Sequence, residues 1–544
     1  MTWVLGIRSV PDTHSDCCEL YLPQQVHLDR PPGRSFLIKL SKRSTSMSSN
    51  PLKKVVIVGG GTAGWITAAA LSRQLGNVLD ITLIESDLIG TIGVGESTVP
   101  PIRIFHKLLG IDEQSFMKAT AATFKLGIEF NDWYTPGSQY MHSFGKSGKD
   151  TWLGEFHHFW MRANRLGISQ GFSDHSLEMQ AAKSGRFGKE PQAAMTYAYH
   201  LDSSRYATFL RTFSTNLGVK RIEGKVTQVV QADNGHITTL ELESGQHLDG
   251  DLFIDCTGFS GLLIDKTLNV DYEDWSQWLL CDSAVTVQTE AQEDPLPYTQ
   301  ATAHPEGWRW QIPLQHRLGN GLVYSQQHLS QDAALERLQQ SVSGKPLTDP
   351  KVLHYKTGRR RQPWYRNCVA IGLSSGFIEP LESTSIHLII TAVTHLMKLF
   401  PYDEIRESHV RQYNDLVRSE VESVRDFIIL HYHLTKRDDS PFWRSCKAVD
   451  IPDSLAHRIE LFKSQAHVFQ SNNDLFSSDS WVQVMLGQGV SPQRYHPIAD
   501  VMTPDHLQKF ITGDRNSVQQ TVRQLPSHQS FLDRYCAMDR GQVF

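Results

Sequence analysis

The chain has 544 residues and a net charge of −5, and 40% of its residues are hydrophobic. This is the composition of an ordinary globular protein that is long enough for more than one lobe. The slight acidity gives no general attraction to nucleic acid or to a membrane, and no apolar run reaches the roughly 18 residues of a membrane-spanning helix. Seven cysteines without a C-x-x-C pair favour a reducing compartment, so we predict a cytoplasmic protein.

The first 50 residues differ from the rest of the chain. They mix proline, serine, arginine and aspartate without a regular apolar period, and they end in the polar stretch Arg43–Asn50. The segment also lacks the apolar core of a signal peptide. We predict that residues 1–50 form a disordered or weakly ordered N-terminal extension.

A dinucleotide-binding unit is predicted directly after this extension. The apolar run Val55–Val58 predicts a buried parallel strand, and glycines at G-x-G-x-x-G spacing follow in residues 59–64. The pattern of Trp65–Leu75 predicts a helix, and Ile81–Ile84 predicts a second strand that ends at Glu85. This order of strand, glycine turn, helix, strand and acid is typical of dinucleotide binding.

The glycines have physical roles in that interpretation. Gly59 allows the tight turn, Gly61 lets the backbone approach a pyrophosphate, and Gly64 allows close packing of helix on strand. The helix N-terminus attracts the phosphates, and Glu85 can accept hydrogen bonds from ribose hydroxyls. The alternative is a glycine-rich turn of purely structural use.

Further elements follow in chain order. We predict a helix at Pro101–Leu109, mixed structure over 113–134 and mostly helices over 152–218, of which Arg205–Leu217 is the clearest. Alternating residues predict strands at Lys225–Gln231, His236–Glu243, Gln246–His247 and Leu252–Ile254. The last of these leads into Asp255-Cys-Thr-Gly258, a D-x-T-G sequence that is typical of two-domain flavoproteins.

The remainder of the chain divides into a β-rich part and a helical part. Residues 278–326 favour strands, and 367–373 predict one more. A long apolar helix is predicted over 386–400, and from 401 onwards the pattern favours helices joined by loops.

Four motifs together resemble one family. They are Gly59–Gly64, Gly93-Val-Gly-Glu-Ser-Thr-Val-Pro100, Trp308-Arg-Trp-Gln-Ile-Pro313 and Gly376-Phe-Ile-Glu-Pro-Leu-Glu-Ser-Thr384. Over roughly residues 53–500 the chain closely resembles the flavin-dependent halogenases of the tryptophan halogenase type. The W-x-W-x-I-P sequence after a G-x-G-x-x-G turn is quite specific for these halogenases among flavoproteins.

The resemblance implies an architecture. We expect an α/β fold of the FAD-binding Rossmann type (GR2 or hydroxylase-like) with a mostly helical substrate-binding lobe. The FAD-binding lobe, with interleaved substrate-site segments, is expected over 51–400. The helical lobe that covers the substrate site is expected over 401–544.

The resemblance also implies a chemistry. A separate flavin reductase delivers reduced FAD, which reacts with O2 to give a hydroperoxide, and a halide ion, chloride or bromide, is oxidised to hypohalous acid. That species passes through a tunnel to a lysine beside a small, electron-rich aromatic substrate. The family further suggests a homodimer, and neither nucleic acid nor membrane is an expected partner.

Two residues match the family's catalytic pair. Lys125, after Phe124, matches the lysine, which can donate a hydrogen bond to hypohalous acid or, when deprotonated, carry the halogen as a haloamine. Glu382 matches the glutamate that stabilises the cationic ring intermediate and accepts its proton. Outside the motif, a lone lysine is usually a solvated surface residue, and Glu382 would be an acid at a helix entry.

Other positions match the residues that, in the family, bind the halide and contact FAD. The backbone N–H groups of Thr384 and Ser385 match the halide site at a helix start, although the family usually has glycine at position 385. Trp308 and Trp310 match tryptophans beside the flavin. Outside the motif, they would be interpreted as two core aromatic residues on one face of a strand. The residues that match FAD contacts are Gly59, Gly60, Gly61, Thr62, Ala63, Gly64, Glu85, Ser86, Ile89, Ile92, Val94, Ser97, Val226, Leu373 and Ile386.

The substrate site combines a match with a departure. His142 and Phe144 match a His-x-Phe pair that stacks on the indole of the substrate. In tryptophan halogenases a tyrosine-rich and acid-rich lid grips the amino acid, whereas Ser471–Ser480 is short, polar and without a Tyr-Tyr pair. We therefore expect an indole-like aromatic without an amino acid backbone, bound in a more open pocket.

Three polar clusters are not assigned a function, and two other functions of the protein remain open. Arg359–Arg361 is predicted to be a solvated turn, and His157-His158 and His431–His433 lack partner ligands at recognisable spacing, so no metal is predicted. One alternative function is a single-component FAD-dependent aromatic monooxygenase, in which Lys125 would be dispensable. The other is a flavin-binding protein without turnover.

Overall fold

The computed structural model describes residues 51–88, 96–152, 154–169, 171–189, 194–471 and 474–538. The predicted N-terminal extension and the predicted cofactor contacts Ile89, Ile92 and Val94 lie outside the described residues. None of the helices in these ranges combines the length and apolar character needed to cross a bilayer.

A six-stranded sheet carries the dinucleotide-binding unit. Its order is β20-β21-β12-β1-β2-β8, and every neighbouring pair is parallel except β20 with β21. The apolar residues of β1 are buried, because the strand lies in the middle of the sheet with helices packed on it. The strands are β1 (Lys54–Val58), β2 (Asp80–Glu85), β8 (Lys220–Glu223), β12 (Leu252–Asp255), β20 (Trp364–Tyr365) and β21 (Cys368–Ala370).

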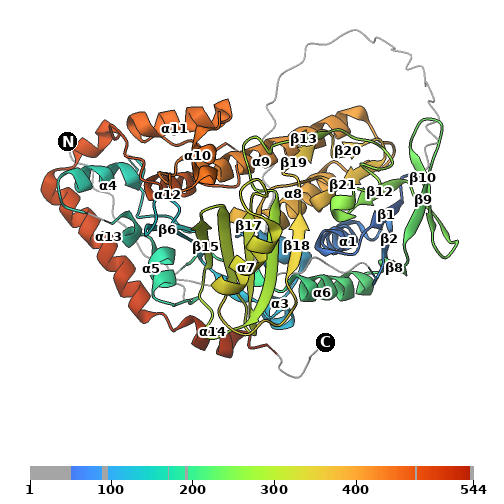
Figure 1. Cartoon of the computed structure of the whole chain (residues 1–544), viewed down its shortest axis with the longest axis horizontal. Helices are drawn as coiled ribbons and strands as arrows, with labels where there is room; N and C mark the ends of the chain where they lie inside the picture. The colour runs from blue at the N-terminus through green and yellow to red at the C-terminus, as the bar shows by residue number, and fades with distance from the viewer. Residues whose placement is uncertain are drawn as a thin grey trace, which may run out of the picture. The chain divides into compact units, whose positions relative to one another are not determined.

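Helices α1 (Thr62–Leu75), α6 (Ser203–Asn216) and α8 (Ser385–Lys398) pack together beside this sheet. The predicted strand-turn-helix-strand unit is therefore confirmed, and the parallel sheet confirms the α/β class. In Figure 1 this unit lies at one end of the view, with α1 next to β1 and β2.

A seven-stranded sheet forms the middle of the molecule, in the order β18-β14-β17-β16-β15-β5-β6. Its pairs are antiparallel except β15 with β5. The strands are β5 (Gly127–Asn131), β6 (Gln139–Ser143), β14 (Ser283–Glu290), β15 (Thr299–His304), β16 (Gly307–Pro313), β17 (Arg317–Tyr324) and β18 (Lys351–His354). This sheet confirms the β-rich prediction for residues 278–326 and carries the predicted tryptophan pair on β16.

The remaining strands of the described residues form three small sheets of three strands each. They have the orders β3-β7-β4, β11-β10-β9 and β13-β19-β22. Their strands are β3 (Glu96–Ser97), β4 (Thr123–Lys125), β7 (Ala198–Leu201), β9 (Val226–Gln231), β10 (Ile237–Leu242), β11 (His247–Asp249), β13 (Tyr272–Asp274), β19 (Gly358–Arg360) and β22 (Gly376–Phe377). Strand β7 interrupts the region 152–218, so the prediction of mostly helical structure missed the strand that places Lys125.

Helices dominate the chain after residue 401, as predicted. They are α9 (Glu407–His433), α10 (Pro441–Ala448), α11 (Asp453–Gln465), α12 (Ser478–Gly487), α13 (Pro504–Gln524) and α14 (His528–Tyr535). Helix α12 packs on β6, and one apolar core joins residues of α9 and α12 to the seven-stranded sheet. In Figure 1 helices α10 to α13 lie in the same half of the view as β6, away from α1.

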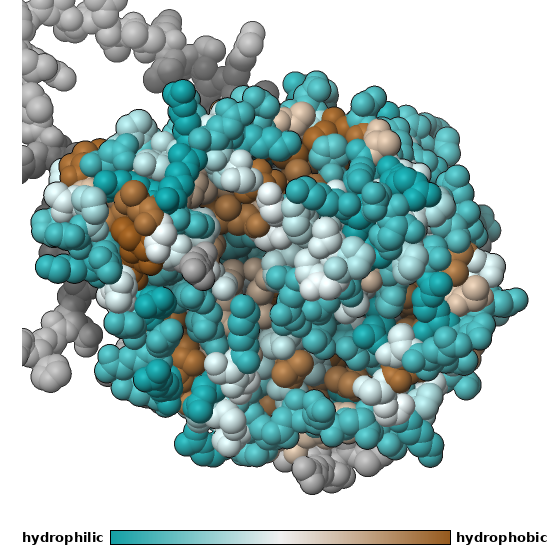
Figure 2. Space-filling model, turned by 60° about the vertical axis from the view of Figure 1, so that its left-hand side comes forward, coloured by the Kyte–Doolittle hydropathy of each residue, from teal (hydrophilic) through white to brown (hydrophobic). Residues whose placement is uncertain are grey.

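The remaining α-helices precede α8 in the chain. They are α2 (Pro101–Leu109), α3 (Glu113–Thr120), α4 (Phe156–Arg165), α5 (Leu177–Lys183) and α7 (Gln331–Ser341). Helix α2 has the predicted bounds, because Pro101 starts it and Gly110, at φ 72°, ends it. The face turned forward in Figure 2 is mostly hydrophilic, with separate small apolar areas.

Candidate active site

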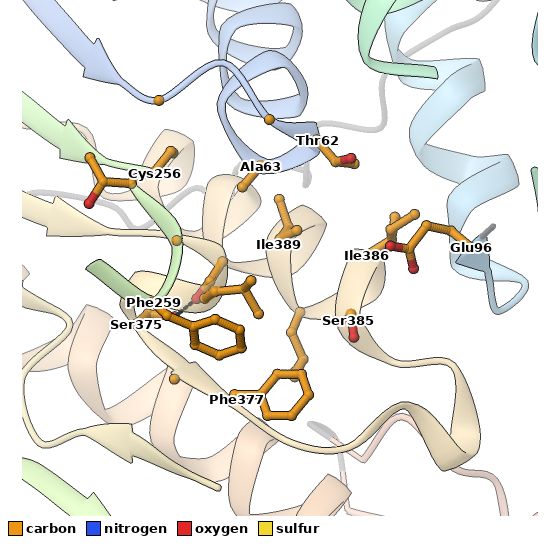
Figure 3. A pocket seen from close by; sticks show the side chains of 18 of the residues that line it. Thr62, Ala63, Glu96, Cys256, Phe259, Ser375, Phe377, Ser385, Ile386 and Ile389 are labelled. Carbon is orange, nitrogen blue, oxygen red and sulfur yellow. Dashed lines mark hydrogen bonds between the residues drawn. The ribbon is translucent and has the colours of Figure 1, made fainter. Parts of the chain in front are cut away.

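A cavity of about 840 Å³ lies where the first parallel strands end. The carboxyl ends of β1, β2 and β12 and the first turn of α1 meet there, as in dinucleotide-binding sheets. Figure 3 shows Thr62, Ala63, Cys256, Ser385 and Ile386 around the cavity. The predicted cofactor residues that line it are Gly59, Gly60, Gly61, Thr62, Ala63, Glu85, Ser86, Ser97, Val226, Leu373 and Ile386.

The glycine turn is packed too closely for side chains. A Cβ on Gly60 would lie 1.6 Å from Glu85 Oε2, and a Cβ on Gly59, at φ 111°, would lie 2.3 Å from the Cys256 carbonyl oxygen. Gly64 does not line the cavity, but a Cβ there would lie 1.9 Å from the Gly59 carbonyl oxygen. Helix α1 begins without a side-chain cap, so its first N–H groups are left for a phosphate. The turn therefore fits the pyrophosphate of a dinucleotide.

Two acidic residues shape the adjoining walls. Glu85 lines the cavity and accepts hydrogen bonds from Trp65 Nε1 at 3.1 Å and Arg221 Nε at 2.5 Å. Asp255 is buried, and its carboxylate accepts the N–H groups of Leu263 and Ile264, each at 2.8 Å. Asp255 thus fixes the D-x-T-G loop, of which Cys256, Thr257 and Gly258 line the cavity.

The tryptophan pair forms another wall. Trp308 and Trp310 lie on β16, are buried and line the cavity, with ring centroids 5.8 Å apart. Gly321 on β17 makes room for this pair, because a Cβ there would lie 2.0 Å from the Trp310 ring. The two tryptophans are therefore core residues of the β-sheet and also form part of the cavity wall.

Lys125 is fully buried and lies one hydrogen bond from the cavity. Its ammonium donates to Ser383 Oγ at 2.9 Å and to the Thr98 carbonyl oxygen at 3.2 Å. Ser383 lines the cavity and has a left-handed backbone, with φ 61°, which is costly for a residue other than glycine. Burial lowers the pKa of Lys125 from 10.5 to about 7, although nearby Glu382 opposes the shift. Ser383 was not among the predicted site residues, because no local pattern indicates that a serine reaches the lysine.

Glu382 is fully buried between two histidines. His142 Nδ1 lies 2.8 Å from one carboxylate oxygen, and His431 Nε2 lies 2.9 Å from the other. Burial raises the pKa of Glu382, but the two histidines outweigh it and bring the pKa to about 2. Tyr140 supports this arrangement, since its hydroxyl lies 2.8 Å from His431 Nδ1. We call Lys125, Glu382, His142 and His431 the Lys–Glu cluster.

The predicted halide residues stand at the start of α8. Thr384 is the N-cap residue and is fully buried, and Ser385 is the first helical residue and lines the cavity. No side chain caps this helix end. The first N–H groups of α8 are therefore available to an anion at the cavity wall.

Aromatic side chains surround the Lys–Glu cluster. The ring of Phe144 lies 5.0 Å from Lys125 Nζ, and His142 is buried with its ring 5.4 Å from Phe427. Phe427 stacks on Phe476 at 3.8 Å and meets Trp481 edge-on at 4.8 Å. The structure thus brings His142 and Phe144 together with Glu382 and Lys125, as the family match predicts. Phe427 on α9, Phe476 just before α12 and Trp481 on α12 were missed, because isolated aromatic residues usually signal only a core.

The interpretation of Arg359–Arg361 as a solvated turn is wrong for two of the three arginines. Arg359 and Arg360 are buried in β19, whereas Arg361 is exposed in the bend that follows the strand. Arg359 pairs with Glu273 at 2.7 Å and Glu422 at 3.1 Å, and Arg360 pairs with Asp265 at 2.8 Å. These carboxylates come from distant parts of the chain, and both arginines line the cavity.

The histidine pair of α4 has structural partners. Glu155, His157 and His158 lie close enough together to share a metal ion. His157 Nε2, however, donates to the Ala466 carbonyl oxygen at 2.9 Å, and His158 Nδ1 accepts the His496 N–H at 3.2 Å. Nδ1 of His158 must therefore carry no proton, which leaves the proton on Nε2. The absence of a metal stays a prediction.

Comparisons with known proteins place these features in context. The family model for tryptophan halogenase matches residues 54–504. A tryptophan 6-halogenase of Streptomyces toxytricini is 37% identical over 89% of this chain and 99% of its own length. A tryptophan 7-halogenase of Lentzea aerocolonigenes is 32% identical over 89% of this chain and 99% of its own.

Solved structures agree with these relatives. A flavin-dependent halogenase from Xanthomonas campestris is 50% identical, with a TM-score of 0.89, and covers 91% of this chain and 100% of its own. A flavin-dependent halogenase from Brevundimonas sp. BAL3 is 41% identical, with a TM-score of 0.85, over 89% of this chain and 99% of its own.

Proposed function

The chain belongs to the tryptophan halogenase family and is a flavin-dependent halogenase, and on this basis we propose its reaction. It uses reduced FAD, O2 and chloride or bromide to halogenate an electron-rich aromatic of the indole type. The observation that carries the proposal is the hydrogen bond from buried Lys125 to Ser383, at 2.9 Å. Because Ser383 also lines the cavity, a small oxidised halogen species formed there is one side chain away from the lysine.

The cavity would hold FAD. The Gly59–Gly64 turn and the first N–H groups of α1 would bind the pyrophosphate, and Glu85 would accept hydrogen bonds from the ribose. When bound, reduced FAD supplies the activation of O2 that oxidises the halide. Trp308 and Trp310 would keep organic substrate away from the flavin by filling the wall with bulk.

The start of α8 would hold the halide. The backbone N–H groups of Thr384 and Ser385 would donate hydrogen bonds to the anion, so the site would need no positively charged side chain in the cavity. The hydroxymethyl group of Ser385 lines the same wall and would narrow the halide position. The preference between chloride and bromide would therefore depend on this side chain.

Lys125 would receive the halogen species. With a pKa of about 7, its side chain is present at neutral pH both as an ammonium and as a free amine. The ammonium can hydrogen-bond the oxygen of hypohalous acid and make the halogen more electrophilic. The free amine can carry the halogen as a haloamine.

Glu382 would act on the substrate ring. With a pKa of about 2 it stays a carboxylate, so it can stabilise positive charge that develops on the ring during substitution. It is also placed to accept the ring proton. His142 and His431 hold both carboxylate oxygens, which fixes the direction in which the charge acts.

The aromatic surroundings favour a neutral, flat substrate. His142 and Phe144 would stack on the ring, with Phe427, Phe476 and Trp481 around them. Arg458 packs over Trp481 at 4.7 Å but is paired with Asp474 at 2.6 Å, so it is not available for a substrate carboxylate. This supports an indole without an amino acid backbone, although the curated relatives are named for tryptophan.

Several associations remain part of the proposal. A separate flavin reductase would supply reduced FAD, and a homodimer and a cytoplasmic location are proposed from the family resemblance. The lobe boundary near residue 400 is also a proposal.

The direct test is a reaction with defined components. Purified protein is incubated with FAD, a flavin reductase, NADH, O2 and bromide or chloride, with indole and free tryptophan offered together, and products are read by mass spectrometry. We expect a halogen isotope pattern on indole before tryptophan. Preferential halogenation of tryptophan would contradict the substrate assignment, and hydroxylated product would contradict the reaction.

A further inference from the structure

A second glutamate lies three residues before Glu382, and its surroundings are different. Glu379 is fully buried, and neither of its carboxylate oxygens has a hydrogen-bond partner of good geometry among the described residues. The groups that face it are neutral: the Trp308 indole N–H, the hydroxyls of Tyr355 and Tyr432, and the thiols of Cys281 and Cys446.

No cation compensates this carboxyl among the residues that the structure describes. Burial raises the pKa of Glu379 to about 7, and the donors Tyr432 and Trp308 only partly offset the effect. The charged group that acts on its neighbours is Asp282, which carries the same sign and influences Cys281 and Tyr355. A buried carboxyl in such surroundings is stable mainly when it is protonated.

Glu379 lies directly behind the wall of the cofactor cavity. Its sequence neighbours Ile378 and Pro380 line the cavity, and so do Trp308 and Tyr355, which face its carboxyl. Ser385, at the proposed halide position, lines the same cavity (Figure 3). A charge on Glu379 therefore acts across low-dielectric protein on any anion held at the start of α8.

We propose that Glu379 is a proton-binding residue of this cavity and that halide binding is coupled to proton uptake by its carboxyl. The proposal rests on the proposed halide site. An ionised Glu379 and a halide repel one another, so the halide binds together with one proton from solvent, and both leave together. The cavity then gains no net charge, and no other bond forms or breaks.

The coupling has a sign that can be measured. Halide should bind more tightly at low pH, where Glu379 is protonated, and more weakly as the pH rises through about 7. If the halide raises the pKa of Glu379 by about one unit, affinity falls roughly tenfold between pH 6 and pH 9. Near pH 7.5 the binding of one halide would then take up about half a proton.

The experiment measures bromide binding to protein loaded with oxidised FAD. Bromide is titrated from pH 6 to pH 9 by calorimetry, in two buffers with different ionisation enthalpies, which gives the number of protons taken up per bromide. Lys125 titrates in the same range, so the measurement is made in wild type and in Lys125→Met. A pH dependence that survives Lys125→Met is assigned to another group.

Two glutamine variants, each in the Lys125→Met background, then test that assignment. Glu379→Gln keeps the shape of the protonated carboxyl, so we expect the tight, low-pH affinity at every pH and no proton uptake. Glu178→Gln is the matched control, because Glu178 is also a buried carboxyl with a pKa raised to about 7 by burial, but it does not line the cavity. This control should keep the pH dependence.

The outcomes separate the inference from the function on which it rests. Bromide binding without proton uptake in Lys125→Met, or proton uptake that persists in Glu379→Gln, would overturn the role of Glu379 and leave the halide site standing. Absence of bromide binding in all variants at all pH values would overturn the halide site and, with it, this inference. A circular dichroism spectrum like that of wild type confirms that each variant is folded.

Discussion

The cofactor cavity and the Lys–Glu cluster differ in which part of the chain builds them: backbone in the cavity and side chains in the cluster. The cavity depends on backbone: a glycine turn without room for a Cβ, and the uncapped starts of α1 and α8. The cluster depends on side chains, because Lys125 from β4, His142 from β6 and His431 from α9 converge on Glu382. A site made of backbone tolerates few substitutions, because there is no space for a larger side chain. A site made of charged side chains is instead sensitive to substitutions that change its charge.

This comparison predicts its largest effect at Lys125. Lys125→Ala removes the group that we propose to receive the halogen species but changes no residue that lines the cavity. We expect halogenation to fall by at least about 1000-fold, while FAD affinity and the oxidation of reduced flavin by O2 stay as in wild type. Product formation is followed by mass spectrometry and flavin oxidation by absorbance. Halogenation at the wild-type rate would remove Lys125 from the mechanism.

The next effect is expected at Glu382. Glu382→Gln keeps the shape but removes the negative charge that two histidines hold in place. The rate of ring halogenation should fall by about 100- to 1000-fold, the cost of losing one electrostatic stabiliser in a buried site. FAD affinity should not change. An unaffected rate would reduce Glu382 to a structural acid at the entry to α8.

A substitution in the cavity should show the reverse pattern. Gly60→Ala places a methyl group 1.6 Å from Glu85 Oε2, so the turn or Glu85 must move. We expect FAD affinity to fall by about tenfold or more, which corresponds to roughly 1.4 kcal/mol, measured by flavin fluorescence. At saturating FAD the halogenation rate should recover most of its wild-type value. If the rate stayed low at saturation, the cavity and the cluster would not be separable.

The same contrast explains how far the sequence could be interpreted. Apolar runs and glycine spacing predict β1, α1 and β2, because local sequence determines a strand, a tight turn and a helix. The four-residue strand β7 was missed, since it is too short to show a period. The family motifs identified Lys125 and Glu382 as individual candidate residues, without indicating which side chains surround them.

The environment of those positions could not be predicted from the sequence. Nothing local indicates that His431, 49 residues beyond Glu382, closes on its carboxylate, or that Ser383 adopts a left-handed backbone to reach Lys125. Arg359 was misread for the same reason, because its partners Glu273 and Glu422 come from other elements. Pairing across distant segments is decided by tertiary packing.

The smallest predicted effect concerns stability and tests the charge balance of the cluster directly. Burial holds the pKa of Lys125 at about 7, against 10.5 for a lysine in the unfolded chain, so the unfolded chain binds a proton between these pH values that the folded chain does not. Stability of the wild type should therefore rise with pH across this window and be flat below it. A shift of this size costs the fold about 5 kcal/mol at pH 6, which the two hydrogen bonds of the ammonium offset by about 2.

Lys125→Met removes both the cost and the hydrogen bonds. We expect the variant to be about 2 to 3 kcal/mol more stable than wild type at pH 6, with the difference shrinking toward zero near pH 9. Urea unfolding at several pH values measures this, and Lys118→Met, an exposed position on α3, is the matched control that should show no such trend. A variant that is less stable at pH 6 would mean that the ammonium is well compensated by Glu382. The cluster would then hold a stable ion pair, and the free-amine form of Lys125 would be too rare at neutral pH to carry halogen.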